Sequence, residues 1–142
     1  MPLEPKKYLL SPFNAMGRSL LKRLESPEDF YEKRIINNMQ NLRKEIQIGD
    51  VLLVEGNSKI SRIMQLLTKS SWSHAAFYMG DHLKTSDQEH MLIEAEAGNG
   101  VTAVPLNKYE DYNIRICRPF GISEKDLDRV VEAVTQKFRK AL

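Results

Sequence analysis

His74 is the residue of this chain whose type and position best suit catalysis. It follows Trp72-Ser73 and precedes the small and apolar residues 75–79, so it opens a strand with its ring at the edge of the core. An imidazole titrates near neutrality, with an ordinary pKa of about 6.5, and can act as general base for a thiol or hydroxyl. A core-edge histidine that bonds a backbone carbonyl is the other interpretation, and the surrounding residues leave both open.

Glu94 is the second candidate, because it lies in the middle of the apolar strand Leu92 to Ala95. Burying a carboxylate there costs free energy unless the group is paired. An imidazole on an adjacent strand would satisfy both groups and hold the ring in one tautomer. Glu96 shares the same face by alternation, so a solvent-facing Glu94 is the alternative. We predict His74 and Glu94 as the catalytic residues.

The cysteine and serines near these strands are weaker candidates. Cys117, the only cysteine, lies late in a strand, and Pro119 and Gly121 separate it from the next helix. A nucleophilic thiolate usually draws on a helix N-terminus and an imidazole, so we predict a structural role for Cys117. Ser71 and Ser73 flank the histidine without the Gly-x-Ser-x-Gly turn that exposes a serine nucleophile.

Metal and cofactor binding are not predicted. His74, His82 and His90 are eight residues apart, and none of the usual short ligand spacings occurs. With one cysteine, the chain has neither an internal disulfide nor a Cys-rich zinc site.

Length and composition indicate one ordinary globular domain. The chain has 142 residues, 42% hydrophobic and 28% charged, with no apolar run of the roughly 18 residues that a membrane-spanning helix needs. A net charge of +2 gives no reason to expect a nucleic-acid partner. The N-terminus lacks the pattern of a secretory signal, so we expect a location in the cytoplasm or at the periphery of a membrane.

The first 24 residues differ from the rest in charge. Leucines and other apolar residues alternate there with five basic residues against Glu4 alone, which fits either a helix that binds a membrane surface or a helix docked on its own domain. The basic residues are Lys6, Lys7, Arg18, Lys22 and Arg23.

The elements that must position His74 and Glu94 follow from capping residues and apolar spacing. Helices are predicted from Ser11-Pro12 onward, over 27–44, over 58–68 and over 123–141, each opened by a serine or a Ser-Pro pair. Strands are predicted over 51–54, 74–79, 91–95, 101–104 and 114–117, with Gly98-Asn99-Gly100 as the turn of a hairpin.

The predicted fold class is therefore α+β. A small, mostly antiparallel sheet of about five strands is packed by the helices near 58–68 and 123–141. Residues 1–45 form an N-terminal helical extension, and residues 46–142 form the main domain.

An ordered set of motifs resembles the permuted papain-like amidases, the YiiX/YaeF-like branch of the NlpC-type cysteine hydrolases. The resemblance covers about residues 46–141 and follows the family's order of elements. The motifs are Gly49 to Leu53, Trp72-Ser73-His74-Ala75-Ala76 with Gly80, Ile93-Glu94-Ala95, Gly100-Val101 through Val104-Pro105-Leu106, and Arg115 to Pro119.

This resemblance implies a Cys-His acyl transfer on an amide or ester, with a peptide-, lipid- or cell-wall-type acyl substrate. His74 resembles the general base, Glu94 the residue that orients it, and Asp50 a structural turn residue. The family's nucleophile follows the last helix, so it is expected beyond residue 142, and the chain by itself is expected to be inactive. A non-catalytic binding or scaffold domain, degenerate or truncated, is the alternative hypothesis.

Overall fold

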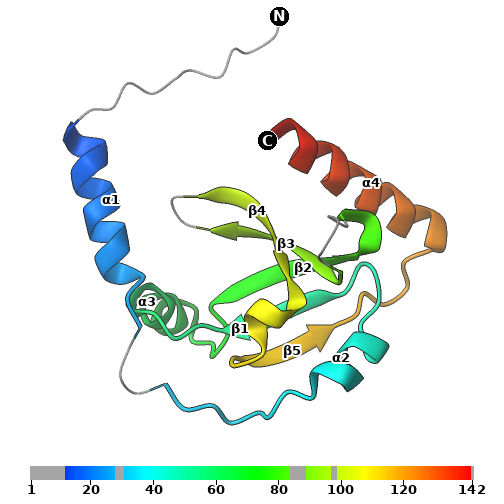
Figure 1. Cartoon of the computed structure of the whole chain (residues 1–142), viewed down its shortest axis with the longest axis horizontal. Helices are drawn as coiled ribbons and strands as arrows, with labels where there is room; N and C mark the ends of the chain where they lie inside the picture. Colours follow the sequence, from blue (N-terminus) through cyan, green and yellow to red (C-terminus); the bar gives the residue numbers. More distant parts are fainter. Residues whose placement is uncertain (1–11, 28–30, 84–88, 97–98, 142) are drawn as a thin grey trace, which may run out of the picture.

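The fold joins four α-helices, two short 3-10 helices and one five-stranded sheet within the residues that the structure describes (Figure 1). The structure is a computed structural model, and it describes residues 12–27, 31–83, 89–96 and 99–141. In chain order, the elements are α1 Pro12–Leu24, α2 Met39–Glu45, β1 Val51–Glu55, α3 Lys59–Thr68, β2 His74–Gly80, η1 Asp81–Leu83, β3 Met91–Glu96, β4 Gly100–Pro105, η2 Leu106–Tyr109, β5 Asn113–Cys117 and α4 Glu124–Ala141.

The sheet confirms the predicted α+β class. All neighbouring strands are antiparallel, in the order β4-β3-β2-β1-β5. Each predicted strand is present, and β3 and β4 form the predicted hairpin, in which Gly100 has a positive φ of 75°. Gly98, the first glycine predicted for that turn, lies outside the described residues. The short helices η1 and η2 were not predicted.

Each face of the sheet has its own apolar core. Leu52 and Val54 of β1 point to one face, where η2, residues of α2 and the β5 isoleucines complete the packing. On the other face, α4 packs Val131 against Met79 and Ile93. The alternation of buried and half-buried residues along β1 follows from the two-residue period of a strand.

A tight turn begins β1. Gly49 has a φ of 93°, and a Cβ added there would lie 2.3 Å from Cδ1 of Leu127 in α4. The positive φ therefore favours glycine, and the Leu127 side chain would have to shift to admit a larger residue. The next residue, Asp50, is buried and accepts two hydrogen bonds from Arg118, which agrees with its predicted structural role.

The predicted helix over 27–44 is wrong for most of its length. Residues 31–38 are irregular, and only α2, Met39–Glu45, is helical, with Asn38 as its N-cap. Asn113 explains the difference, since its side chain bonds backbone groups of this segment. Those groups include the backbone amides of Arg34 and Ile35, which donate to Oδ1 of Asn113 because an irregular segment does not use them in helical hydrogen bonds. Residues 28–30 of the predicted helix lie outside the described residues.

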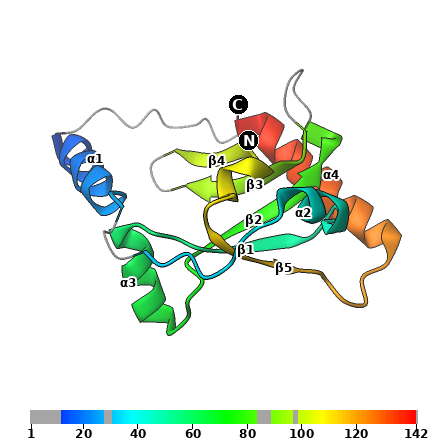
Figure 2. The same cartoon turned by 60° about the horizontal axis from the view of Figure 1, so that its bottom comes forward.

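The helix predicted over 58–68 is present as α3, capped by Ser58, but it does not pack on a face of the sheet as predicted. It has no buried residue and lies beyond the ends of β1 and β2, in contact with α1 (Figures 1 and 2). The short connections explain its place, because β1 ends at Glu55 and α3 begins at Lys59. The predicted packing of the C-terminal helix is confirmed for α4.

Candidate functional site

His74 is the first residue of β2 and pairs with Val54 of β1. Its side chain is 26% exposed and lines a cavity of about 490 Å³. The preceding residue, Ser73, holds the backbone in place. Its backbone amide donates to the Val54 carbonyl, and its side-chain Oγ accepts a hydrogen bond from the Gly56 amide. His74 is therefore fixed at the end of the sheet, with its ring at the cavity.

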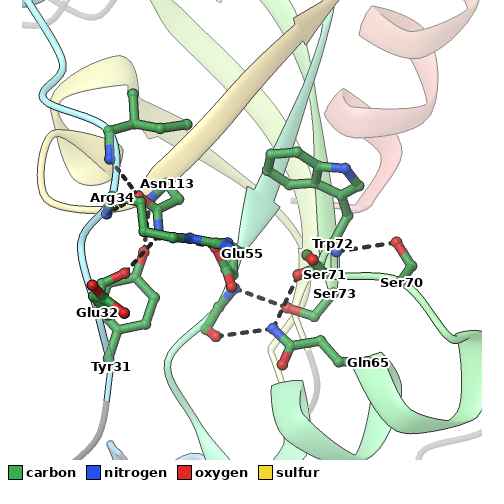
Figure 3. Close-up of polar contacts among 12 residues, drawn as sticks. Tyr31, Glu32, Arg34, Glu55, Gln65, Ser70, Ser71, Trp72, Ser73 and Asn113 are labelled. Atoms are coloured by element: carbon green, nitrogen blue, oxygen red, sulfur yellow. Dashed lines mark hydrogen bonds and ion pairs between the residues drawn. The ribbon is translucent and has the colours of Figure 1, made fainter.

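Figure 3 shows how the segment before His74 is tied to the elements around it. The side-chain amide of Gln65 in α3 donates from Nε2 to the backbone carbonyl of Ser71 at 3.0 Å and to that of Gly56 at 3.4 Å. The Trp72 amide donates to Ser70 Oγ at 3.1 Å. Side chains of α3 and this segment thus supply the hydrogen bonds that the irregular backbone cannot make for itself.

Glu94 lies on β3 and contacts His74 across the sheet. Its Oε2 is 2.9 Å from Nε2 of His74, and the carboxylate is buried. The register pairs Glu94 with Ala76, so the two side chains meet diagonally on one face. The pairing of imidazole and carboxylate predicted from the sequence is present in the structure, and the catalytic role of each residue stays a prediction.

Two further residues hold the same carboxylate, and sequence reasoning missed both. Lys108 and Tyr109 come from η2, the short helix that follows β4. Nζ of Lys108 bridges one oxygen of Glu94 and one of Glu96, and the Tyr109 hydroxyl donates to Oε2 of Glu94. Glu96 therefore faces the same cluster as Glu94, in agreement with their shared face.

These contacts keep Glu94 ionised. Burial opposes ionisation, but hydrogen bonds from His74, Lys108 and Tyr109 outweigh it and lower the pKa of Glu94 to about 2. Burial and the adjacent Glu94 carboxylate raise the pKa of Tyr109 above its ordinary value. Although burial acts against its charge, hydrogen bonds to Glu94 and Glu96 raise the pKa of Lys108. At neutral pH the site thus contains a carboxylate, a phenol and an ammonium group.

The arrangement determines which imidazole nitrogen can accept a proton. A carboxylate only accepts hydrogen bonds, so the pairing with Glu94 places a proton on Nε2 of His74. The lone pair of the neutral ring then lies on Nδ1, for which the described residues provide no hydrogen-bond partner. This is the tautomer required of a base that takes a proton from a nucleophile in the cavity.

Cys117 does not belong to this site. It pairs with Val51 on β1, three residues from the Val54 position that faces His74. Side chains alternate along a strand, so Cys117 points to the opposite face of the sheet. Cys117 and His74 are also separated by two strand spacings across the sheet and by about 10 Å along the strands. The predicted structural role of Cys117 is consistent with this position.

The cavity combines apolar and polar walls. Its polar residues include hydroxyls of the α3 N-terminus, where Ser58 Oγ lies 2.9 Å from Ser61 Oγ. The apolar part comes from β1, α3 and the two tyrosines near β5. The main apolar residues are Val54, Ile60, Met64, Tyr109 and Tyr112. Across the part of the chain that the structure describes, no cluster of His, Cys, Asp or Glu could hold a metal ion.

Comparison with known proteins identifies the family of this chain. The family model described as permuted papain-like amidase enzyme, YaeF/YiiX, C92 family, matches residues 45–140. The chain therefore belongs to the permuted papain-like amidase family, a family of hydrolases, which confirms the resemblance read from its motifs. A search of the curated proteins found no match.

Proposed function

We propose that this chain provides the general base and its orienting carboxylate for acyl transfer from an amide or ester to a cysteine thiolate. One observation carries the proposal: Nε2 of His74 is bound by the buried Glu94, which leaves Nδ1 as the basic nitrogen at a cavity. Membership of the amidase family supports the same reaction class.

The proposed reaction begins when Nδ1 of His74 takes the proton of a cysteine thiol. The thiolate sulfur attacks the carbonyl carbon, and the tetrahedral intermediate collapses as the imidazolium returns the proton to the departing amine or alcohol. Water then loses a proton to the imidazole and cleaves the thioester, which releases the acid and restores the thiol. Throughout, Glu94 holds the ring in place and stabilises the imidazolium.

The cavity suits an acyl group with both apolar and polar parts. Tyr109, Tyr112 and Met64 offer apolar surface, and Ser58 and Ser61 offer hydroxyl groups. Such a lining fits a peptide-, lipid- or cell-wall-type acyl substrate, as first inferred from the family resemblance. The base and cavity are proposed to act on that group together with a cysteine other than Cys117.

A non-catalytic binding domain is the second candidate, and one observation favours it. Cys117 is the chain's only cysteine, and it lies on the face of the sheet opposite to His74. In this case, the cavity beside His74 would bind an acyl-type ligand without cleaving it.

Turnover by His74 and Glu94 variants distinguishes the two candidates. The complete gene product is assayed with p-nitrophenyl esters and anilides of short and medium acyl chains. We expect His74→Ala to lower kcat/KM by roughly 10²–10⁴-fold, the usual value of a general base. Glu94→Gln should lower it about 10- to 100-fold, because the ring loses its fixed orientation.

His82 provides the matched control, because it is an exposed histidine of η1 outside the cavity. His82→Ala should retain full activity, and each variant should retain a melting temperature close to that of the parent. Full turnover by a folded His74→Ala protein would refute the proposal. The absence of turnover in the parent protein, with an acyl ligand still bound, would favour the binding domain.

A further inference from the structure

Helices α1 and α3 together expose six large apolar side chains. Leu66 and Leu67 of α3 are 70% and 75% exposed, and Met16 and Leu20 of α1 are 73% and 59% exposed. Ile63 and Met64 add to the exposed apolar surface of α3. A soluble domain rarely leaves such a group of large apolar residues uncovered, so this surface is a candidate for an interaction.

The same two helices, together with Lys69 at the C-cap of α3, carry only positive charge. Residues 12–24 and 59–69 contain six basic residues and no Asp or Glu, whereas the remainder has 21 − 6 = 15 basic and 19 acidic residues. None of the six basic residues forms an ion pair with any residue that the structure describes. They are Arg18, Lys22, Arg23, Lys59, Arg62 and Lys69.

The two helices lie together at one end of the molecule. They contact each other, and both views show them beyond the same end of the sheet, with α4 on the other side (Figures 1 and 2). We call the exposed apolar and basic residues of α1 and α3 the α1–α3 face. It therefore combines about +6 of charge with exposed leucine and methionine side chains in one region.

We propose that the α1–α3 face docks the protein on an anionic lipid bilayer. Helices that lie in a membrane interface bury an apolar side and place Lys and Arg beside it, where they attract acidic headgroups. A second copy of this chain is a poor partner, because a symmetric contact would bring six cations against six others without a counter charge. A polyanion alone would leave the leucines uncovered.

Docking by this face would also bring the His74 cavity close to lipid. Ile60 and Met64 of α3 line that cavity together with His74. If the proposed function holds, its acyl substrate would then come from the membrane surface. The docking itself rests only on the exposed residues and their charge, so it can be tested without any activity.

Vesicle binding tests the proposal directly. The full chain is mixed with vesicles of phosphatidylcholine alone or with 30 mol% phosphatidylserine, and binding is measured by sedimentation. We expect binding to the anionic vesicles only, and a decrease when the salt concentration is raised, since surface attraction is screened. Equal binding to neutral vesicles, or none to either, would refute the proposal.

Two double variants separate the contributions of charge and apolar surface. Arg62→Gln with Lys69→Gln should weaken partitioning about 25-fold, at roughly fivefold per cation. Leu66→Ser with Leu67→Ser should weaken it at least about tenfold, because two exposed side chains that insert into the interface are lost. All four positions are exposed, so circular dichroism should show an unchanged fold.

The matched control neutralises two exposed lysines of α4, Lys125→Gln with Lys137→Gln. This variant should bind vesicles like the parent, and an equal loss would show that only net charge matters. Binding to a DNA oligonucleotide as strong as to the anionic vesicles, and indifferent to the leucine substitutions, would instead identify a nucleic-acid surface. A stable dimer that the leucine substitutions dissociate would identify a self-association surface.

Discussion

Among the residues that the structure describes, two carboxylates are buried, Asp50 just before β1 and Glu94 within β3, and their partners differ in kind. Asp50 is 1% exposed, and Arg118 donates to both of its oxygens at 2.9 Å. The Gln47 amide supplies a third hydrogen bond. Glu94 is 3% exposed and is shared by an imidazole, a phenol and an ammonium group.

The difference separates a structural ion pair from a candidate site. A guanidinium keeps its charge at every physiological pH, so Arg118 cannot act as a base, and we expect its pair with Asp50 to fix the turn before β1. The partners of Glu94 include an imidazole, which exchanges protons near neutrality, and that imidazole borders a cavity. Burial of a carboxylate therefore does not indicate function by itself, whereas its partners and its access to open space do.

The largest effect on stability is expected for Glu94, and an acid titration should reveal it. The folded-state pKa of Glu94 is about 2, below the ordinary 4.5, so Glu94 stabilises the fold above pH 4.5 and this contribution is lost as pH falls toward 2. The shift corresponds to roughly 3 kcal/mol. In urea unfolding at pH 7 and pH 3, the parent should lose more stability than Glu94→Gln.

Glu124→Gln is the control for this titration, because Glu124 is exposed at the start of α4. It should follow the parent at both pH values. An identical loss of stability in Glu94→Gln and the parent would show that the hydrogen bonds to Glu94 do not stabilise its charged form.

Replacing the other carboxylate should affect stability alone. Asp50→Asn keeps the shape of the side chain but replaces the carboxylate whose two oxygens accept hydrogen bonds from Arg118. We expect a loss of about 2 kcal/mol in the free energy of unfolding, within the range for hydrogen bonds to charged groups. Ester or anilide turnover measured below the unfolding transition should be unchanged, and a large fall in kcat would place Asp50 in the site.

The smallest effect is expected at Cys117. Cys117→Ala removes a half-buried thiol from the face of β5 that points away from His74. Turnover and its pH dependence should remain those of the parent, with a stability change below about 1 kcal/mol. Iodoacetamide labelling of Cys117 should proceed equally in the parent and in His74→Ala. Labelling that slows without His74 would make the cysteine a partner of the imidazole.

The sequence was sufficient where local residues determine structure. Aliphatic runs between glycine turns identified all five strands, and the polar Glu94 in an apolar strand predicted the contact with His74. The irregular segment 31–38 could not be predicted in this way, because its backbone bonds Asn113, a residue distant in the chain. Lys108 was missed for the same reason, since only the folded sheet brings η2 to Glu94.

The strand order has a consequence for how the chain folds. Among the described strands, β1 comes first in the sequence and lies inside the sheet, and the partner that covers its outer edge is β5, the last of them. Until Asn113 to Cys117 have been synthesised, β1 has an open edge with unpaired backbone groups, a recognised template for aggregation. The pairing of β1 with β5 also joins segments that are distant in the sequence, which favours slow folding.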